Sequence, residues 1–394
     1  MEESFWRVIH TKAKEKGHVF IFHSQSGVPY VFLKSYGQGF QNKVQLVMNT
    51  DTTEIAVQKV SNDQMPLEGE FNLTKLPKDR EIRMLDHLNA LVRNPVNPDA
   101  IALNPRWATY ISYEAAPHSI RLGARTNTVV RRVSYWKFCN GGCLADWSRS
   151  CKEDSPRTLV FPVSIVARCI AQVCQTLEFM YTADSKPIYH CDLHLSNIFV
   201  HFADDKGILP DFYIGDLGLT RTASESLADT LMKEQRDGLN AASGPVSVTT
   251  PPNIPPFGQR RQWDIGRFID CLEEITRDIF RMKSGEQSES LTELRSLMSL
   301  VAWLNSQEAA LAARNPTSRP PSLRPIMDRA RKLEETARAI ELNTEAYKAF
   351  CEFAHHRKHI ILHSNPFVVS GEKSEAEEYG RMMVAGPWTV VRSI

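Results

Sequence analysis

The sequence lacks the cysteine spacings that would mark a zinc-binding or disulfide-rich protein. None of its 8 cysteines forms a Cys-x-x-Cys pair. Cys139, Cys143 and Cys151 lie near one another in the sequence, but their spacing fits no zinc template. Cys169 and Cys174 fall within a helical pattern, where reduced thiols in a core are expected rather than disulfides.

Long uncharged apolar runs, strong net charge and internal repeats are also absent. The first residues, Met1 to Ser4, are acidic, so neither a transmembrane helix nor a secretory signal is predicted. We therefore expect a cytoplasmic or nuclear protein with no membrane partner. A formal net charge of +1 argues against a dedicated nucleic-acid binder.

What is present is the composition of an ordinary folded protein, with 42% hydrophobic and 24% charged residues in 394. A strand, a glycine turn and the start of a helix are predicted over residues 128–147, and a mostly apolar helix over 161–181. Residues 101–128 show no clear pattern beyond two possible strands. Residues 220–253 are polar and unpatterned, which is typical of a long loop. The pattern from 286 to about 360 is helical.

One stretch contains most of the candidate chemistry. His190, Asp192 and Asn197 match the pattern H-x-D-x-x-x-x-N, and Asp216 and Gly218 follow as Asp-x-Gly. A lone H-x-D is a weak signal, because a buried histidine that caps a turn gives the same pattern. Here each motif adjoins a short apolar run typical of a buried strand. The two motifs in this order indicate a phosphotransfer site.

The chemistry of phosphotransfer explains why these residue types are needed. One carboxylate must orient the attacking hydroxyl, and metal ions must neutralise the phosphate oxygens. Asp192 suits the first task. Asn197 offers an amide oxygen and Asp216 an anionic oxygen, and both are ligands that Mg²⁺ accepts. The predicted cofactors are therefore ATP and Mg²⁺.

A glycine-containing turn between two predicted strands would cover the phosphates. Gly37 and Gly39 have no Cβ, so the backbone can lie close to a phosphate. Lys59 ends a segment of the V-A-I-K form, in which the lysine binds the α and β phosphates. Glu81, in a helix predicted over residues 78–91, is the carboxylate expected to pair with Lys59. A solvent-exposed glutamate favoured by the helix dipole is the alternative.

In this order the motifs resemble the eukaryotic protein-kinase-like superfamily over about residues 37–325, and their divergent details resemble a fungal-type protein kinase. The resemblance implies an α+β, bilobal fold with a small β-rich N-lobe, which has one main helix, and a larger, mostly helical C-lobe. It divides the chain into an N-terminal extension packed on the N-lobe (1–30), the N-lobe (31–138), the C-lobe (139–360) and a C-terminal tail (361–394).

The resemblance also implies the rest of the nucleotide site. The backbone of Lys137, Phe138 and Cys139 would form the hinge that binds adenine, with Val44 assigned to the same site. Trp136 would then stand where a side chain limits the depth of the pocket, and its bulk would narrow that pocket.

Several residues depart from the family pattern or have an implied supporting role. Cys191 replaces the arginine that usually reads a phosphate in the activation loop, so control by loop phosphorylation is less expected. His194 replaces a lysine that steadies the γ-phosphate, a task that a neutral imidazole performs less well. Phe257 replaces a structural glutamate. Asp264 is implied to steady the catalytic-loop backbone, and a surface N-cap is its alternative role.

The implied function is ATP- and Mg-dependent transfer of the γ-phosphate to a Ser or Thr hydroxyl of a protein substrate. Two alternatives stay open: a pseudokinase that serves as a scaffold or binding module, and a small-molecule kinase similar to aminoglycoside and choline kinases. The Asp-Leu-Gly motif and the long Ser/Thr-rich loop favour a protein substrate. The presence together of Lys59, Asp192, Asn197 and Asp216 favours an enzyme.

Overall fold

The computed structural model describes most of the chain between His18 and Arg392. The described residues are 18–24, 26–38, 42–49, 51–52, 54–61, 65–66, 79–122, 125–153, 159–203, 209–222, 260–282, 288–314, 321–363 and 389–392. Gly39, Phe257 and most of the predicted long loop lie outside the described residues.

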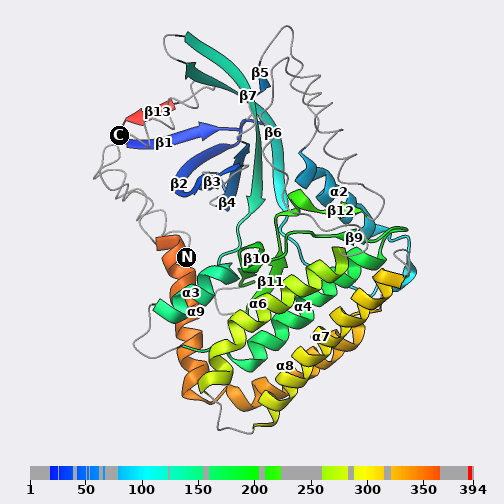
Figure 1. Cartoon of the computed structure of the whole chain (residues 1–394). Coiled ribbons are helices and arrows are strands. Elements are labelled where there is room, and N and C mark those ends of the chain that lie inside the picture. Colours follow the sequence, from blue (N-terminus) through cyan, green and yellow to red (C-terminus); the bar gives the residue numbers. More distant parts are fainter. Residues whose placement is uncertain are drawn as a thin grey trace.

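The protein is a mixed α+β structure with an antiparallel sheet at one end and most of its helices at the other (Figure 1). The strand order of this sheet is β13-β1-β2-β3-β4-β7-β5, with β6 paired to β7. Its strands are β1 (His18–His23), β2 (Pro29–Gln38), β3 (Asn42–Asn49), β4 (Ile55–Ser61), β5 (Met65–Pro66), β6 (Tyr110–Leu122), β7 (Arg125–Lys137) and β13 (Thr389–Arg392). The strands predicted around the glycine turn, and the strand of Lys59, are confirmed.

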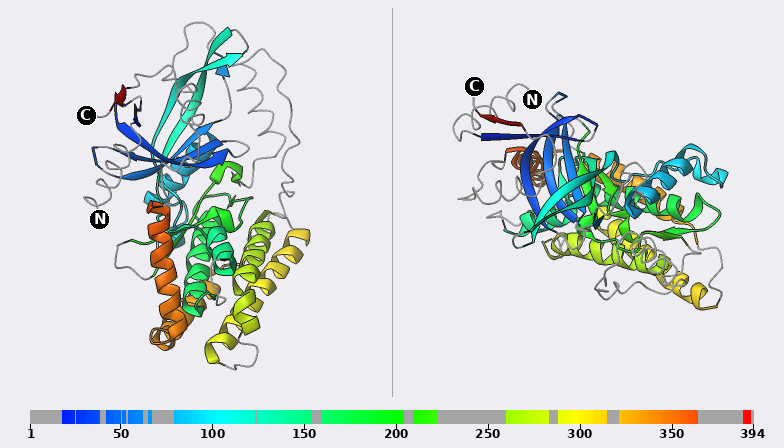
Figure 2. Two further views of the ribbon diagram at one scale, coloured as in Figure 1. Left: turned by 90° about the vertical axis from the view of Figure 1, so that its left-hand side faces the viewer. Right: turned by 90° about the horizontal axis from the view of Figure 1, so that it is seen from above.

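The two ends of the described chain meet at one edge of the sheet. β13 pairs with β1 in antiparallel register, with Val19 opposite Val391 and Phe20 opposite Val390, and Figure 2 shows both strands side by side. The segment expected to be an N-terminal extension therefore supplies one strand, and the segment expected to be a C-terminal tail supplies its neighbour.

The hairpin of β6 and β7 is longer and more continuous than the sequence pattern indicated. β7 confirms the strand predicted from residue 128, and β6 is one strand where residues 107–113 and 120–122 gave only two short strand signals. Its register runs from Tyr110 opposite Trp136 to Leu122 opposite Arg125. β7 pairs with β4 only between Val133 and Lys137, and β5 pairs with β7 at Val129 and Val130. The hairpin therefore extends well beyond β4 (Figure 2). The half beside β4 carries the predicted hinge strand.

Seven α-helices are described, and α4 lies at the centre of the helical group. They are α2 (Arg80–Arg93), α3 (Leu144–Glu153), α4 (Val163–Thr182), α6 (Arg260–Met282), α7 (Glu289–Arg314), α8 (Arg324–Glu341) and α9 (Glu345–His363). α4 confirms the predicted apolar helix. Within the described part of the chain it alone is long and apolar enough to cross a membrane, but 94% of its most apolar window is buried in the structure. This is the burial of a core helix.

Short strands lie between the large sheet and the helices. β10 (Ile198–His201) pairs with β11 (Asp211–Ile214) and with β8 (Gly142–Cys143), and β9 (Ile188–Tyr189) pairs with β12 (Arg221–Thr222). β10 and β11 are the two strands predicted beside the motifs. All eight cysteines are free thiols, as expected.

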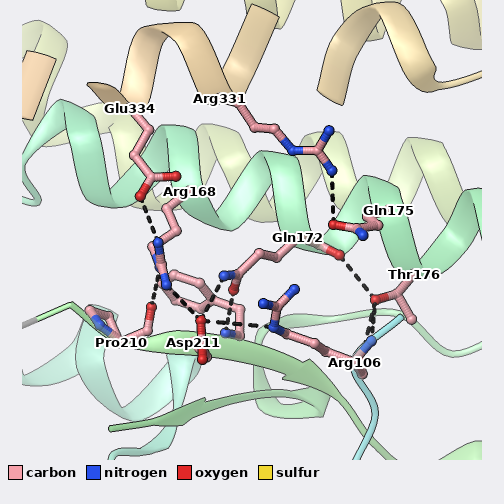
Figure 3. Close-up of polar contacts among 10 residues, drawn as sticks. Arg106, Arg168, Gln172, Gln175, Thr176, Pro210, Asp211, Arg331 and Glu334 are labelled. Carbon is pink, nitrogen blue, oxygen red and sulfur yellow. Dashed lines mark hydrogen bonds and ion pairs between the residues drawn. The ribbon is translucent and has the colours of Figure 1, made fainter. Parts of the chain in front are cut away.

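Polar contacts fix β11 on the helices behind it (Figure 3). The carboxylate of Asp211 accepts hydrogen bonds from Arg168 Nη2 and Gln172 Nε2 of α4, each at 2.7 Å. Arg168 Nη1 also contacts Glu334 of α8 at 2.7 Å. This network sets the position of the strand that leads into Asp216.

Candidate active site

The two motif loops are brought together by the pairing of β10 with β11. Because Ile198 and Ile214 are Cα partners, the residues just outside them, Asn197 and Gly215, are neighbours. The N–H of Gly215 donates to the carbonyl oxygen of Asn197 at 2.9 Å. The loop of Asp192 and the Asp-x-Gly loop are thus hydrogen-bonded to each other.

His190 is a second link between these loops. It is fully buried, and its Nδ1 accepts the backbone N–H of Asp192 at 3.2 Å. Its Nε2 must therefore carry the proton, which it donates to the carbonyl oxygen of Gly215 at 2.9 Å. Burial lowers the pKa of His190, so the imidazole is neutral and holds the loops rather than acting as a base.

Asp264 holds the turn that leads into Asp192. Its buried carboxylate accepts the backbone N–H groups of His190 and Cys191, each at 2.8 Å, and the hydroxyl of Tyr181 at 3.3 Å. Asp264 lies inside α6 with no exposed surface. The predicted role in steadying this backbone is confirmed, and the alternative of a surface N-cap is wrong.

The side chain of Asp192 follows directly after this turn. Asn197 Nδ2 donates to the carbonyl oxygen of Asp192 at 2.9 Å and to its Oδ2 at 3.3 Å. His194 Nε2 lies 3.7 Å from the same Oδ2, and the side chain of Asp192 keeps 36% of its surface exposed. The carboxylate is therefore positioned by neighbours and still open to an incoming hydroxyl.

Two oxygens remain for a metal ion. Since Asn197 uses its amide nitrogen toward Asp192, its Oδ1 is left as an acceptor. Asp216 has a left-handed backbone with φ of 57°, and among the described residues no hydrogen bond uses its carboxylate. No group of three or more His, Cys, Asp or Glu in the described part could hold a metal. An amide and a carboxylate that rely on phosphates for further ligands suit Mg²⁺.

Lys59 and Glu81 form an ion pair near Asp216. Lys59 Nζ lies 2.8 Å from Oε1 and 2.9 Å from Oε2 of Glu81. The predicted pairing is confirmed, and the alternative of a solvent-exposed Glu81 is wrong, because only 7% of its side chain is exposed. Burial would lower the pKa of Lys59, but the charges of Glu81 and Asp216 outweigh it and raise the pKa. Lys59 is therefore charged, and Asp216 is close enough to contribute.

The register of the sheet aligns the phosphate-binding candidates. Gly37 is opposite Val44, Val44 is opposite Lys59, and Lys59 is opposite Ser134, so these residues form one row across β2, β3, β4 and β7. The pairing of β2 with β3 is irregular between Ser35 and Gly37. The described part of the predicted glycine turn thus begins beside Val44 and Lys59.

The predicted hinge follows β7 and is fixed at both ends. The N–H of Lys137 donates to the carbonyl oxygen of Thr109 at 2.8 Å, and the carbonyl oxygen of Cys139 accepts the N–H of Gly142 at 2.9 Å. Within the described chain no hydrogen bond uses the N–H of Cys139, which leaves it as a donor for an adenine nitrogen. Burial raises the pKa of the Cys139 thiol to about 12, so the thiol is neutral. Phe138 is half-buried beside it.

Cys191 has no charge to offer to a phosphate. It is buried, its Sγ donates to the carbonyl oxygen of Tyr189 at 3.6 Å, and its backbone is left-handed with φ of 65°. Arg80 of α2 instead contacts the segment after Asp216, since its Nη2 donates to the carbonyl oxygen of Thr220 at 2.7 Å.

A cavity of about 440 Å³ opens beside the catalytic loop, between α3 and α6. It is lined by Ala145, Arg149, Leu193, His194, Leu195, Ser196, Arg267, Asp270, Cys271 and Glu274. Sequence reasoning found none of the residues contributed by α3 and α6, because no local spacing connects two helices that are more than a hundred residues apart. The cavity reaches His194, whose Nε2 lies 3.7 Å from Oδ2 of Asp192.

In comparisons with known proteins, no family model and no curated protein matches this chain. The resemblance to protein kinases therefore rests on the motifs and contacts described above.

Proposed function

We propose that the protein is an ATP- and Mg²⁺-dependent kinase that transfers the γ-phosphate to a Ser or Thr hydroxyl of a protein substrate, on a bilobal protein-kinase-like fold. In this proposal the large sheet and α2 form the small lobe, and α3, α4 and α6–α9 belong to the large lobe. The observation that carries it is the Lys59–Glu81 pair at 2.8 Å, beside Asp216. The loop of Asp216 is hydrogen-bonded to the loop in which Asn197 positions Asp192.

Each residue has one role in the proposed mechanism. Lys59, held by Glu81, binds the α and β phosphates. The backbone of Lys137–Cys139 binds adenine, and Gly37, Gly39 and Val44 cover the nucleotide. Mg²⁺, bound by Asn197 and Asp216 together with the phosphates, would neutralise charge on the phosphate oxygens.

Asp192 performs the remaining step. Its exposed carboxylate orients the acceptor hydroxyl for in-line attack and accepts its proton as the new oxygen–phosphorus bond forms. The bond from the γ-phosphorus to the β,γ-bridging oxygen breaks in the same step, and ADP leaves with that oxygen. His194, 3.7 Å from this carboxylate, lies between Asp192 and the cavity. The cytoplasm or nucleus, where ATP is available, is the proposed location.

A small-molecule kinase is the second candidate. The observation that favours it is the cavity of about 440 Å³ at the catalytic loop, a size typical of sites for small ligands. An acceptor panel of generic proteins, amino sugars and choline distinguishes the two. Transfer to a small acceptor and to no protein would replace the first candidate with the second.

Phosphotransfer from labelled ATP tests the proposal. We expect Asp192→Asn to lower the rate by about 10²–10⁴-fold and Lys59→Met by at least about a hundredfold. Lys348→Met, a change to an exposed lysine on α9, is the matched control and should transfer at the wild-type rate. Transfer that survives both active-site substitutions would refute the assignment.

Nucleotide binding separates a pseudokinase from an enzyme and tests the metal ligands. We expect ATP with Mg²⁺ to raise the melting temperature more than ATP alone, and Asn197→Ala and Asp216→Asn to remove the difference. Equal stabilisation with and without Mg²⁺ in the wild-type protein would show that the roles given to Asn197 and Asp216 are wrong. Binding without any transfer would identify a pseudokinase.

A further inference from the structure

Helix α2 is held at points other than its glutamate. Trp107 Nε1 donates to Asn89 Oδ1 at 3.0 Å, and the hydroxyl of Tyr110 donates to Asp86 Oδ1 at 2.7 Å. Asp86 and Asn89 lie one to two turns beyond Glu81 on the same helix. The segment that enters β6 thus contacts α2 twice along its length.

Tyr110 also contacts the hinge strand. Its ring lies edge-on to that of Trp136, with the ring centroids 6.1 Å apart and an angle of 65° between the planes. Trp136 is only 3% exposed, and its Nε1 donates to Ser134 Oγ at 2.8 Å. The ring of Tyr110 is therefore held between α2 and a buried tryptophan that has one hydrogen-bonded orientation.

Trp136 in turn contacts the phosphate-binding lysine. Lys59 Nζ lies 4.5 Å from the centroid of the Trp136 ring, within the range of a cation–π interaction. Lys59 is opposite Ser134 in the sheet, so Lys59, Ser134 and Trp136 point to the same face. The ammonium is bound by the carboxylate of Glu81 and by the face of an aromatic ring.

These contacts form a closed circuit. It runs from Lys59 to Glu81, along α2 to Asp86, through Tyr110 and Trp136, and back to Lys59. Because each of these contacts restrains the position of the next residue, the loss of one contact is expected to weaken the others. If α2 turned or moved away from the sheet, both the ion pair and the hydrogen bond to Tyr110 would lengthen together.

We infer that Trp107, Tyr110 and Trp136, which we name the aromatic clamp, are positioning residues that hold α2 where Glu81 binds Lys59. The inference rests on the proposed function only for its effect on catalysis. The geometric part, that the clamp restrains the ammonium of Lys59, holds for any ligand. None of the three aromatic side chains needs to touch a phosphate for this role.

Chemical labelling of Lys59 tests the geometric part without any activity. An amine-reactive ester would be added to the wild-type protein and to Tyr110→Phe, which removes only the hydroxyl, and modification of Lys59 would be followed by mass spectrometry. We expect labelling of Lys59 to be about three- to tenfold faster in the variant, since one hydrogen bond to a charged acceptor is lost. Tyr135→Phe is the matched control, because its hydroxyl bonds Gln58 and Glu114 on the other face of the sheet, and it should label at the wild-type rate.

A double-mutant cycle tests the effect on catalysis. We expect Tyr110→Phe to lower kcat/KM for ATP about three- to tenfold. In a Glu81→Gln background the same change should have less than about a twofold effect, because Glu81, which Tyr110 is proposed to position, has already lost its charge. A general loss of structure would multiply the two effects instead. Trp136→Phe, which keeps a ring beside Lys59, should retain more of the ATP affinity than Trp136→Leu.

The outcomes separate the clamp from the proposed function. If the wild-type protein transfers no phosphate, the proposed function fails and the labelling rates alone decide the clamp. Labelling of Lys59 at the wild-type rate in Tyr110→Phe would overturn the inference. Independent effects of Tyr110→Phe and Glu81→Gln on an active enzyme would overturn it as well.

Discussion

Asp264 Oδ1 accepts the backbone N–H of Cys191 at 2.8 Å, across 73 residues of sequence, at a point where Cys191 has φ of 65°. A left-handed backbone at a residue other than glycine costs about 1–3 kcal/mol and persists only where the surroundings impose it. The buried carboxylate of Asp264 is one part of those surroundings. It fixes the turn that leads into Asp192.

The first prediction concerns this anchor. Asn at position 264 offers one acceptor oxygen and places an N–H₂ group against a backbone N–H, so we expect Asp264→Asn to lower the free energy of unfolding by about 1–3 kcal/mol. Phosphotransfer should fall more than ATP binding, because the turn carries Asp192 whereas Lys59 lies on another strand. Urea unfolding and an ATP-dependent melting shift measure the two effects.

The matched control is Glu273→Gln, an exposed position on the same helix. It should change the free energy of unfolding by less than about 0.5 kcal/mol. If Asp264→Asn is as stable as this control and equally active, Asp264 does not fix the turn before Asp192.

The second prediction is a pH dependence. Burial raises the pKa of Asp264 to about 7, although the hydrogen bonds from Cys191, His190 and Tyr181 oppose the rise. In the unfolded chain the group titrates near 3.9, so between these values the folded state binds the proton more tightly. The contribution of Asp264 to stability therefore falls as pH rises from about 4 to about 7, by an amount on the order of 4 kcal/mol.

The difference in unfolding free energy between the wild-type protein and Asp264→Asn isolates this group from the other acids. We expect the wild-type protein to lose stability relative to Asp264→Asn as pH rises from about 4 to about 7. Above about pH 7 the difference between the two proteins should be constant. A difference that does not vary between pH 4 and 7 would mean that Asp264 is charged throughout.

The parts of the site that could be predicted from the sequence are those in which one local pattern determines the outcome. β10 and β11 follow from short apolar runs beside the motifs, and their pairing is enough to bring Asn197 to Gly215. Glu81 is the acid in the first turn of an amphipathic helix that follows the strand of Lys59, so it was the acid of that turn available to pair with the lysine. Local pattern and fold agree at these positions.

Other parts depend on partners that no local pattern identifies. In β6, Ala115, Ala116 and Pro117 break the apolar alternation, and the strand exists because its backbone pairs with β7. β13 is short, and its partner β1 lies at the other end of the chain. Asp211 was not singled out, because it looks like an ordinary turn residue until Arg168 and Gln172 are placed beside it.

The third prediction concerns this last network (Figure 3). The side chains of Arg168, Asp211 and Glu334 are only 22%, 20% and 15% exposed. Arg168→Met would leave two acids without their common partner, and we expect it to lower the free energy of unfolding by about 2–3 kcal/mol. Asp211→Asn should cost less, because Glu334 still pairs with Arg168.

A double-mutant cycle on Arg168 and Asp211 measures their coupling, which should exceed about 1 kcal/mol. The exposed pair Arg331–Asp328, 3.4 Å apart within one helix, is the matched control and should couple by no more than about 0.5 kcal/mol. Equal coupling in the two pairs would show that burial adds nothing to the network.

The fourth prediction concerns the closest approach between the two motif loops. A Cβ on Gly215 would lie 2.1 Å from Cε2 and 2.7 Å from Cδ2 of Phe199 on β10, too close for any atom. Gly215→Ala must therefore move the ring or the loop, and a moved loop loses the hydrogen bonds to His190 and Asn197. We expect a large loss of phosphotransfer, together with a lower melting temperature.

Two companion variants decide whether this contact is the cause. Gly266→Ala adds a Cβ inside α6 that would meet nothing closer than 3.7 Å, and alanine favours a helix over glycine by up to about 1 kcal/mol, so this variant should be as stable as the wild type or more so. Phe199→Leu removes the ring that the new Cβ would strike, so the double variant Gly215→Ala, Phe199→Leu should recover part of the melting temperature lost in Gly215→Ala. If the double variant recovers nothing, the glycine is needed for the backbone of the loop and not for the space that Phe199 occupies.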